Sequence, residues 1–277
     1  MFERDPYRAE ILYKGDARRS PNPVRAIAAH VNWEIVAGFL ILIGFFVFVL
    51  WRGDTQWQGI GTFGFVVVGW VFSLCLHEFA HAATAYLGGD HSDSTRSYLT
   101  FNPLKYVHPV LSILLPLVFI LLGGIGLPGG AVYLQRGLVR NRVWQSAISL
   151  AGPLMNALVA LVCAVPFFLG FFYTHLVLAS ALAVLAFFQV AAVVLNLLPI
   201  PPLDGFGIIS PWLSREVRNG ALAFGNYTFI VLFLLLWYVP AANTLYFSTI
   251  LNLLDHLRID QFIVQGGFTH FRFWIKS

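Results

Sequence analysis

His77, Glu78 and His81 form the pattern HExxH, whose residue types and spacing allow one helix to bind a metal ion. On a helix, positions i, i+1 and i+4 fall within roughly 100° of arc, so both imidazoles reach one ion and the carboxylate borders the same cavity. The pattern lies inside the apolar run 60–87, where ionisable groups are costly and usually functional. The sequence therefore predicts a metal ion and a general base at membrane depth.

A zinc ion that acts in catalysis usually has three protein ligands and keeps a fourth position for water. The candidates for the third ligand are His91, His108, His175, Asp90, Asp93 and Asp204. Asp90, His91 and Asp93 lie in a turn-rich loop beyond the apolar run that contains HExxH. His108 and His175 lie at the ends of other apolar runs. Position therefore favours Asp204.

Asp204 follows Pro199, Pro201 and Pro202 within a long apolar stretch. Prolines lack a backbone donor and end a helix, so the chain is expected to run extended until Gly205 allows a turn. Apolar sequence then resumes, which places the break at membrane depth, as in the discontinuous helices that build ion sites. A surface loop in which Asp204 caps the next helix is the alternative.

The composition predicts a polytopic membrane protein. Hydrophobic residues make up 58% of the chain and charged residues 11%, against about 25% charged residues in soluble domains. The 17 basic and 13 acidic residues give a net charge of 17 − 13 = +4, which is too small and too scattered to indicate a nucleic-acid partner. The partners we expect are the lipid bilayer and proteins within it.

Apolar windows of roughly 20 residues predict about six transmembrane segments in an all-α fold. They are 33–51, 60–87, 106–126, 144–173, 176 to about 212, and 221–239. The fifth is too long for one straight helix. The later segment 244–264 mixes leucines with charged residues and is typical of an amphipathic surface helix. The basic segment 1–32 has no cleavable signal pattern and predicts a cytoplasmic N terminus.

The chain after the HExxH helix is expected to enter the membrane and return on the same side. A full crossing at 106–126 would place the arginines of 136–142 outside, against the tendency of positive loops to stay in the cytoplasm. The glycine-rich break 123–130 would form the turn of a re-entrant element, and 131–135 would return as an extended β-strand. A plain span with an external loop is the alternative.

Across roughly Gly61 to Pro211 the sequence resembles the site-2 protease family of intramembrane zinc metalloproteases (peptidase M50). Three motifs carry the resemblance in order: HExxH at 77–81, AGPLMN at 151–156 and NLLPIPPLDG at 196–205. HExxH alone is short and matches often by chance, whereas all three in an apolar context are specific. The segment 99–105 also resembles compact members, although the family often has an aspartate where this chain has His108.

The resemblance implies that His77, His81 and Asp204 bind one zinc ion per chain. It also implies that Glu78 activates the water molecule at the fourth position of the ion. The general chemistry of zinc hydrolases agrees with each role, because zinc acidifies its water and a nearby carboxylate accepts the proton.

Two further residues are candidates for binding the substrate. Asn156 would hydrogen-bond the substrate backbone or the oxyanion, or else would join two helices near the metal. Val132 lies in the expected return strand, which would offer its backbone to a substrate as an added strand. A transmembrane substrate must arrive unwound, because a helix has its amides paired internally.

We therefore expect an intramembrane zinc endopeptidase that cuts transmembrane segments of other proteins in regulated intramembrane proteolysis. Its expected parts are a cytoplasmic basic segment 1–32, a transmembrane catalytic domain 33–240 and an amphipathic C-terminal segment 241–277, without inserted PDZ or CBS domains. The compact build favours a prokaryotic cytoplasmic membrane. The alternative is an ion-coupled transporter with an intramembrane His/Asp ion site, which would lose flux on Glu78→Gln.

Overall fold

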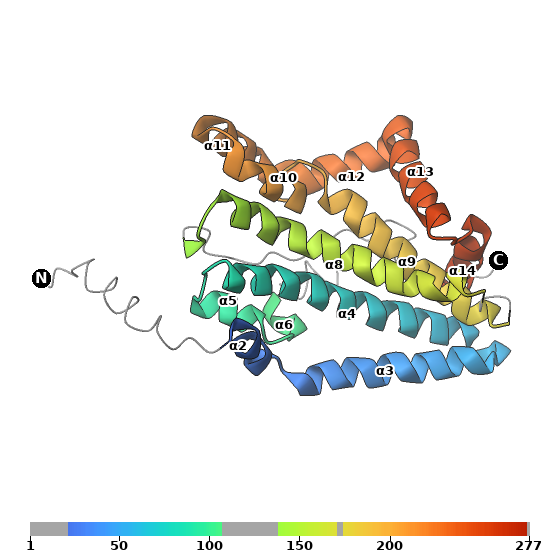
Figure 1. Cartoon of the computed structure of the whole chain (residues 1–277). Helices are drawn as coiled ribbons and strands as arrows, with labels where there is room; N and C mark the ends of the chain where they lie inside the picture. Colours follow the sequence, from blue (N-terminus) through green and yellow to red (C-terminus); the bar gives the residue numbers. More distant parts are fainter. Residues whose placement is uncertain (1–21, 107–137, 171–173, 276–277) are drawn as a thin grey trace, which may run out of the picture.

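The computed structural model describes residues 22–106, 138–170 and 174–275, and the regular structure of these residues is entirely helical (Figure 1). This confirms the prediction of a helical fold for the part of the chain that is described. Most of the predicted re-entrant element, including Val132 and its strand, lies outside these residues.

Five of the described helices begin at a side-chain cap, provided by Asn22, Ser92, Asn141, Ser214 and Asp260. In chain order the described helices are α2 (Pro23–His30), α3 (Trp33–Arg52), η2 (Thr55–Trp57), α4 (Gln58–Leu87), α5 (Asp93–Tyr98), α6 (Pro103–Tyr106), α8 (Arg142–Phe168), α9 (Leu176–Asn196), α10 (Asp204–Ile209), η6 (Ser210–Trp212), α11 (Arg215–Phe224), η7 (Gly225–Tyr227), α12 (Thr228–Tyr238), α13 (Pro240–His256) and α14 (Gln261–Phe271).

Within the described residues, four helical segments are long and apolar enough to cross a membrane, namely Trp33–Arg52, Thr55–Leu87, Arg142–Phe168 and Leu176–Asn196. They correspond to the first, second and fourth predicted spans and to the first part of the fifth. The break predicted in the fifth span is also present, because α9 ends at Asn196 and a new helix begins only at Asp204. The chain is therefore an integral membrane protein of several helical spans.

Helices α4, α8 and α9 pack against one another and form the core of the bundle (Figure 1). Gly69 lets α4 and α9 approach each other closely, since a Cβ at Gly69 would lie 2.7 Å from Leu185 Cδ2 on α9. Helix α3 lies on the outer side of α4 and leaves most of its own surface exposed, as a lipid-facing helix does.

The two ends of the bundle can be defined by the turns between helices. The backbone N–H of Arg140 donates to the carbonyl of Gly88 (3.1 Å), so the start of α8 lies beside the end of α4. We call this end the Gly88 end. At the other end, the Trp57 end, the ring of Trp51 stacks on His175 with 3.6 Å between centroids, which joins the end of α3 to the start of α9.

The predicted sixth span, 221–239, is not one continuous helix. Its residues are divided among α11, η7 and α12, and α12 has only 11 residues before the chain bends by 93° into α13. Pro240 begins α13 after Val239, whose backbone is extended (φ −107, ψ 99). A helix of this length covers about 16 Å, roughly half of the hydrocarbon thickness, so the apolar run forms a broken element.

The segment 244–264, predicted as one surface helix, is divided between two helices. Helix α13 ends before Arg258, which has a positive φ of 59°, and the Asp260 side chain then accepts from the N–H of Phe262 (2.7 Å) at the start of α14. One face of each helix joins the main core beside α9, through the buried residues Tyr246, Ile250, Leu254, Val264 and Phe271.

Candidate metal centre

His77 and His81 lie one turn apart on α4 and face α8. Their imidazoles are buried, and their Nε2 atoms lie 3.0 Å apart. The two ring planes are nearly perpendicular, with an angle of 82° between them. The helix therefore brings the two nitrogen atoms to one point inside the bundle, as the spacing in the sequence predicts.

Asp204 reaches the same point from the break after α9. The break is held by tight turns, in which Ile200 N–H donates to Leu198 (2.8 Å) and Leu203 N–H donates to Ile200 (2.9 Å). Asp204 is the first residue of α10 and does not cap it, because the N-cap position belongs to Leu203. The next residue must be glycine, since a Cβ at Gly205 would overlap the carbonyl oxygens of Leu197 and Leu198.

The Asp204 carboxylate spans both histidines. Its Oδ2 lies 3.2 Å from His77 Nε2, and its Oδ1 lies 3.3 Å from His81 Nε2. One ligand atom from each of the three residues falls within 4.8 Å of the others. The carboxylate is the most accessible of the three, with 20% of the Asp204 side chain exposed against 8% for each histidine. The centre is therefore least covered by protein on the side of Asp204.

The hydrogen bonds of the outer ring nitrogens fit a cation at this point. His81 Nδ1 lies 2.6 Å from the backbone carbonyl of Ile148, which can only accept, so Nδ1 carries the proton and Nε2 keeps its lone pair. His77 Nδ1 is hydrogen-bonded to Asn156 Oδ1 in the same way. Two lone pairs and a carboxylate then converge without a donor between them, an arrangement that a metal ion stabilises.

Gly152 on α8 makes room for the two imidazoles. A Cβ at this position would overlap Nε2 of His81 and would lie 2.5 Å from Nε2 of His77. The AGP sequence at 151–153 therefore brings the α8 backbone directly against the metal-facing side of the histidines. Glu78 is also buried, with 4% of its surface exposed, on the same helix between the two histidines.

Asn156 lies beside the centre, and both ends of its amide are engaged. Its Oδ1 accepts from His77, and its Nδ2 donates to Gln189 Oε1 on α9 (2.7 Å). Gln189 Nε2 in turn donates to Ser73 Oγ on α4 (2.8 Å). The sequence reasoning did not single out Gln189 or Ser73. The signal in the sequence is a glutamine within the apolar run 176–196, because an amide in a membrane needs a partner.

The other described candidates for a third ligand lie elsewhere. Asp90 is buried, but its Oδ2 accepts from Thr95 Oγ1 (2.7 Å) and its Oδ1 from Ser92 N–H (3.0 Å), so it orders the turn after α4. His91 packs its ring on Tyr86 in that turn, where burial and then Arg96 lower its pKa. His175 lies at the Trp57 end, and His108 is outside the described residues.

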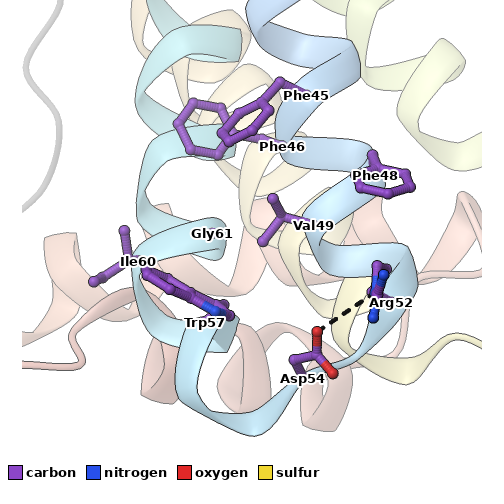
Figure 2. Close-up of a pocket in the computed structure, with 9 residues that line it drawn as sticks. All are labelled: Phe45, Phe46, Phe48, Val49, Arg52, Asp54, Trp57, Ile60 and Gly61. Carbon is purple, nitrogen blue, oxygen red and sulfur yellow. Dashed lines mark ion pairs between the residues drawn. The ribbon is translucent and has the colours of Figure 1, made fainter.

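A separate cavity of about 330 Å³ lies between α3 and α4 near the Trp57 end (Figure 2). Its lining is mostly apolar, and an ion pair between Arg52 and Asp54 (3.5 Å) lies at one side. Gly61, which also lines the cavity, precedes His77 by 77 − 61 = 16 residues, or about 24 Å of helix. This cavity is therefore not part of the candidate metal centre.

Fold and site together define a helical membrane protein with a buried His-His-Asp cluster that fits zinc. No family model matches the chain, and no solved structure matches it. Curated relatives do match. The protein named "Putative zinc metalloprotease Rip2" of Mycolicibacterium smegmatis is 44% identical over 220 residues, which are 78% of this chain and 82% of the relative.

Rip2 of Mycobacterium tuberculosis (strain H37Rv) is 42% identical over 214 residues, covering 77% of this chain and 82% of the relative. "Putative zinc metalloprotease YwhC" of Bacillus subtilis is 32% identical over 193 residues, which cover 65% of this chain and 82% of the relative. All of these names state a zinc metalloprotease, and none states a transporter. The chain belongs to the site-2 protease family of zinc metalloproteases.

Proposed function

We propose that this protein is an intramembrane zinc endopeptidase that hydrolyses peptide bonds in transmembrane segments of other membrane proteins. The observation that carries the proposal is the convergence of His77 Nε2, His81 Nε2 and the Asp204 carboxylate inside a bundle of apolar helices. A membrane interior disfavours such groups unless they have a task, and three His and carboxylate ligands leave a fourth position for water on a catalytic zinc ion.

His77, His81 and Asp204 would hold the ion, and Glu78 would act as general base and acid. Zinc, when bound, polarises the carbonyl of the peptide bond and acidifies a water molecule. Glu78 takes a proton from the attacking water as its oxygen bonds to the carbonyl carbon. It then delivers that proton to the nitrogen as the C–N bond breaks, which yields a carboxyl and an amine.

The orientation we propose places the Gly88 end of the bundle in the cytoplasm. Figure 1 places α2, α5, α6 and α11 at this end together with the start of α8, and these segments contain the cations Arg25, Arg96, Lys105, Arg140, Arg142, Arg215 and Arg218. Among the described residues, the segments at the Trp57 end contain fewer cations, namely Arg52, Arg258 and Arg272. The excess favours the cytoplasm by the positive-inside rule and agrees with a cytoplasmic N terminus. His81 would then lie 87 − 81 = 6 residues from the cytoplasmic end of α4, or about 9 Å of helix, within reach of water.

The excursion between α6 and α8 is proposed to return on the side from which it starts. The contact between Arg140 and Gly88 supports this, because both flanks of the segment then lie at the Gly88 end. A re-entrant element with a returning strand at 131–135 remains our proposal for this segment. Its strand would pair with an unwound substrate near Val132, since an exposed strand edge offers free backbone donors and acceptors.

The test of this function compares the wild type with Glu78→Gln in the native host. Each strain is analysed by quantitative proteomics of membrane protein fragments, and zinc is measured in the purified full-length proteins. We expect equal zinc content, with fragments of single-span proteins present only in the wild-type strain. Equal zinc content with identical fragment sets would overturn the proposed protease.

A further inference from the structure

We propose that Ser73, Gln189 and Asn156 form a chain of hydrogen bonds that fixes the tautomer of His77. The chain starts at the backbone carbonyl of Trp70, so Ser73 and Gln189 are positioning residues for the metal centre although neither touches it. This inference rests on the proposed function, because it assumes that His77 uses its Nε2 lone pair to bind zinc. We call these three side chains the amide chain.

The amide chain joins the three core helices of the bundle. Ser73 Oγ donates to Trp70 O (2.8 Å) on α4, Gln189 Nε2 on α9 donates to Ser73 Oγ (2.8 Å), and Asn156 Nδ2 on α8 donates to Gln189 Oε1 (2.7 Å). The last hydrogen bond joins Asn156 Oδ1 to His77 Nδ1. All three side chains are buried, with exposed fractions of 2% for Ser73, 0% for Gln189 and 5% for Asn156.

The hydrogen bonds in the first half of the amide chain can run in only one direction. A backbone carbonyl accepts and cannot donate, so the single hydroxyl proton of Ser73 is directed to Trp70 O. Ser73 Oγ is then left as an acceptor, and the group that faces it must be a donor. This selects the NH₂ end of the Gln189 amide and turns the carbonyl end of that amide toward Asn156.

The same reasoning continues to the metal ligand. Gln189 Oε1 accepts from the NH₂ end of Asn156, so the carbonyl end of Asn156 faces His77. An acceptor at this place requires a proton on His77 Nδ1, and the neutral ring then has its lone pair on Nε2. Reversing any amide in the amide chain would place N–H against N–H or oxygen against oxygen in a buried site, where an unpaired polar group is costly.

His81 obtains the same tautomer by a shorter route, and this parallel supports the interpretation. Its Nδ1 lies 2.6 Å from the backbone carbonyl of Ile148, an acceptor that has no alternative orientation. Asn156, in contrast, offers His77 an amide that could point either way. Gln189 and Ser73 remove that freedom, so both histidines end with a bare Nε2 facing Asp204.

The test measures zinc affinity of the full chain in detergent by competition with a chelator. Gln189→Met keeps the length of the side chain and removes both hydrogen-bonding ends. We expect about tenfold weaker zinc binding, at the lower end of the effects known for residues that orient a metal ligand. Ser73→Ala should weaken binding by about twofold to tenfold, the value of one hydrogen bond, and Ser73→Thr should restore it.

The matched control is Ser180→Ala on α9. Ser180 is buried and donates to Val177 O three residues earlier (2.8 Å), as Ser73 does to Trp70 O, but it shows no bond to another helix among the described contacts. We expect zinc affinity of the wild type for this variant. The visible absorption spectrum of the Co²⁺-loaded protein should likewise change in Gln189→Met and stay unchanged in Ser180→Ala.

A double-mutant cycle separates positioning from general loss of structure. If Gln189 acts through Asn156, then Gln189→Met adds no further loss of zinc affinity once Asn156→Ala is present. An undiminished effect of Gln189→Met in that background would overturn the inference. So would equal zinc affinity in the wild type, Gln189→Met and Ser73→Ala, a result that leaves the proposed function standing. A wild type that binds no zinc would overturn both.

Discussion

The backbone of Gly152 on α8 lies directly against the imidazole of His77 on α4, so closely that a methyl group at Gly152 would lie 2.6 Å from His77 Cε1. This contact explains why glycine occupies position 152 inside the continuous helix α8. It also means that the space in front of the histidines is set by α8 and is not open to a larger side chain.

Gly152→Ala should therefore weaken zinc binding. The added methyl group must displace His77 or His81 from the point where their nitrogens converge, and we expect a loss of affinity of about tenfold or more, as for other disturbances of ligand orientation. Gly38→Ala on α3 is the control, since a Cβ there meets nothing within 4 Å. Chelator competition on both purified variants is the measurement, and equal affinities would contradict the packing described here.

Asp204→Asn should abolish tight zinc binding while leaving the fold intact. The amide has nearly the shape of the carboxylate but carries no charge, and it presents one NH₂ group to a site that needs acceptors only. The loss of zinc affinity should exceed the roughly 10–100-fold cost of changing a residue that only orients a ligand. Melting temperature and zinc content together separate this outcome from unfolding.

The control for this change is Asp93→Asn. Asp93 was also a candidate ligand by sequence, but it is an exposed residue in the first turn of α5. Zinc content equal to that of the wild type is expected for this variant. Retention of full zinc content in Asp204→Asn would show that another group completes the site.

The three residues of the cluster could be predicted because each has a local signal. His77 and His81 repeat at helical spacing, and Asp204 is a charged residue directly after prolines that end a helix within apolar sequence. Gln189 and Ser73 could not be paired in this way. They are 116 positions apart in sequence, and only the packing of α9 on α4 brings them together.

In the C-terminal third of the chain, the sequence predicts apolar segments but not the directions of the helices. Hydropathy marks 221–239 as a span because it measures composition and not direction. The direction is decided by Pro240, which begins a new helix, and by the burial of Ile250 and Leu254 beside α9. These tertiary contacts direct α13 away from α12 at an angle of 93°, directly after the apolar run ends.

The proposed orientation can be tested with cysteines at the two ends of α8. Leu138 (52% exposed) lies just before the helix, and Leu169 (65% exposed) lies just after it. The two native cysteines are buried, so background labelling should be low. We expect a membrane-impermeant maleimide to label Leu169→Cys in intact cells and Leu138→Cys only after lysis. The reverse pattern would invert the proposed orientation, and equal labelling of both in intact cells would contradict a span at α8.

Adjacent glycines on α14 provide a test of how the C-terminal helices pack. A Cβ at Gly267 would overlap the backbone carbonyl of Ser180 on α9, whereas a Cβ at Gly266 meets nothing within 4 Å. Gly267→Ala should thus lower the free energy of unfolding by about 1–3 kcal/mol, the usual cost of forcing a group into a packed contact. Gly266→Ala should raise it by up to about 1 kcal/mol, because alanine favours the helix.

Thermal unfolding of the two variants in the same detergent measures both effects. Zinc affinity should be unchanged in each variant, because α14 lies beside the start of α9, far from the break that carries Asp204. Equal melting temperatures for the two variants would mean that α14 does not pack on α9 in the membrane protein.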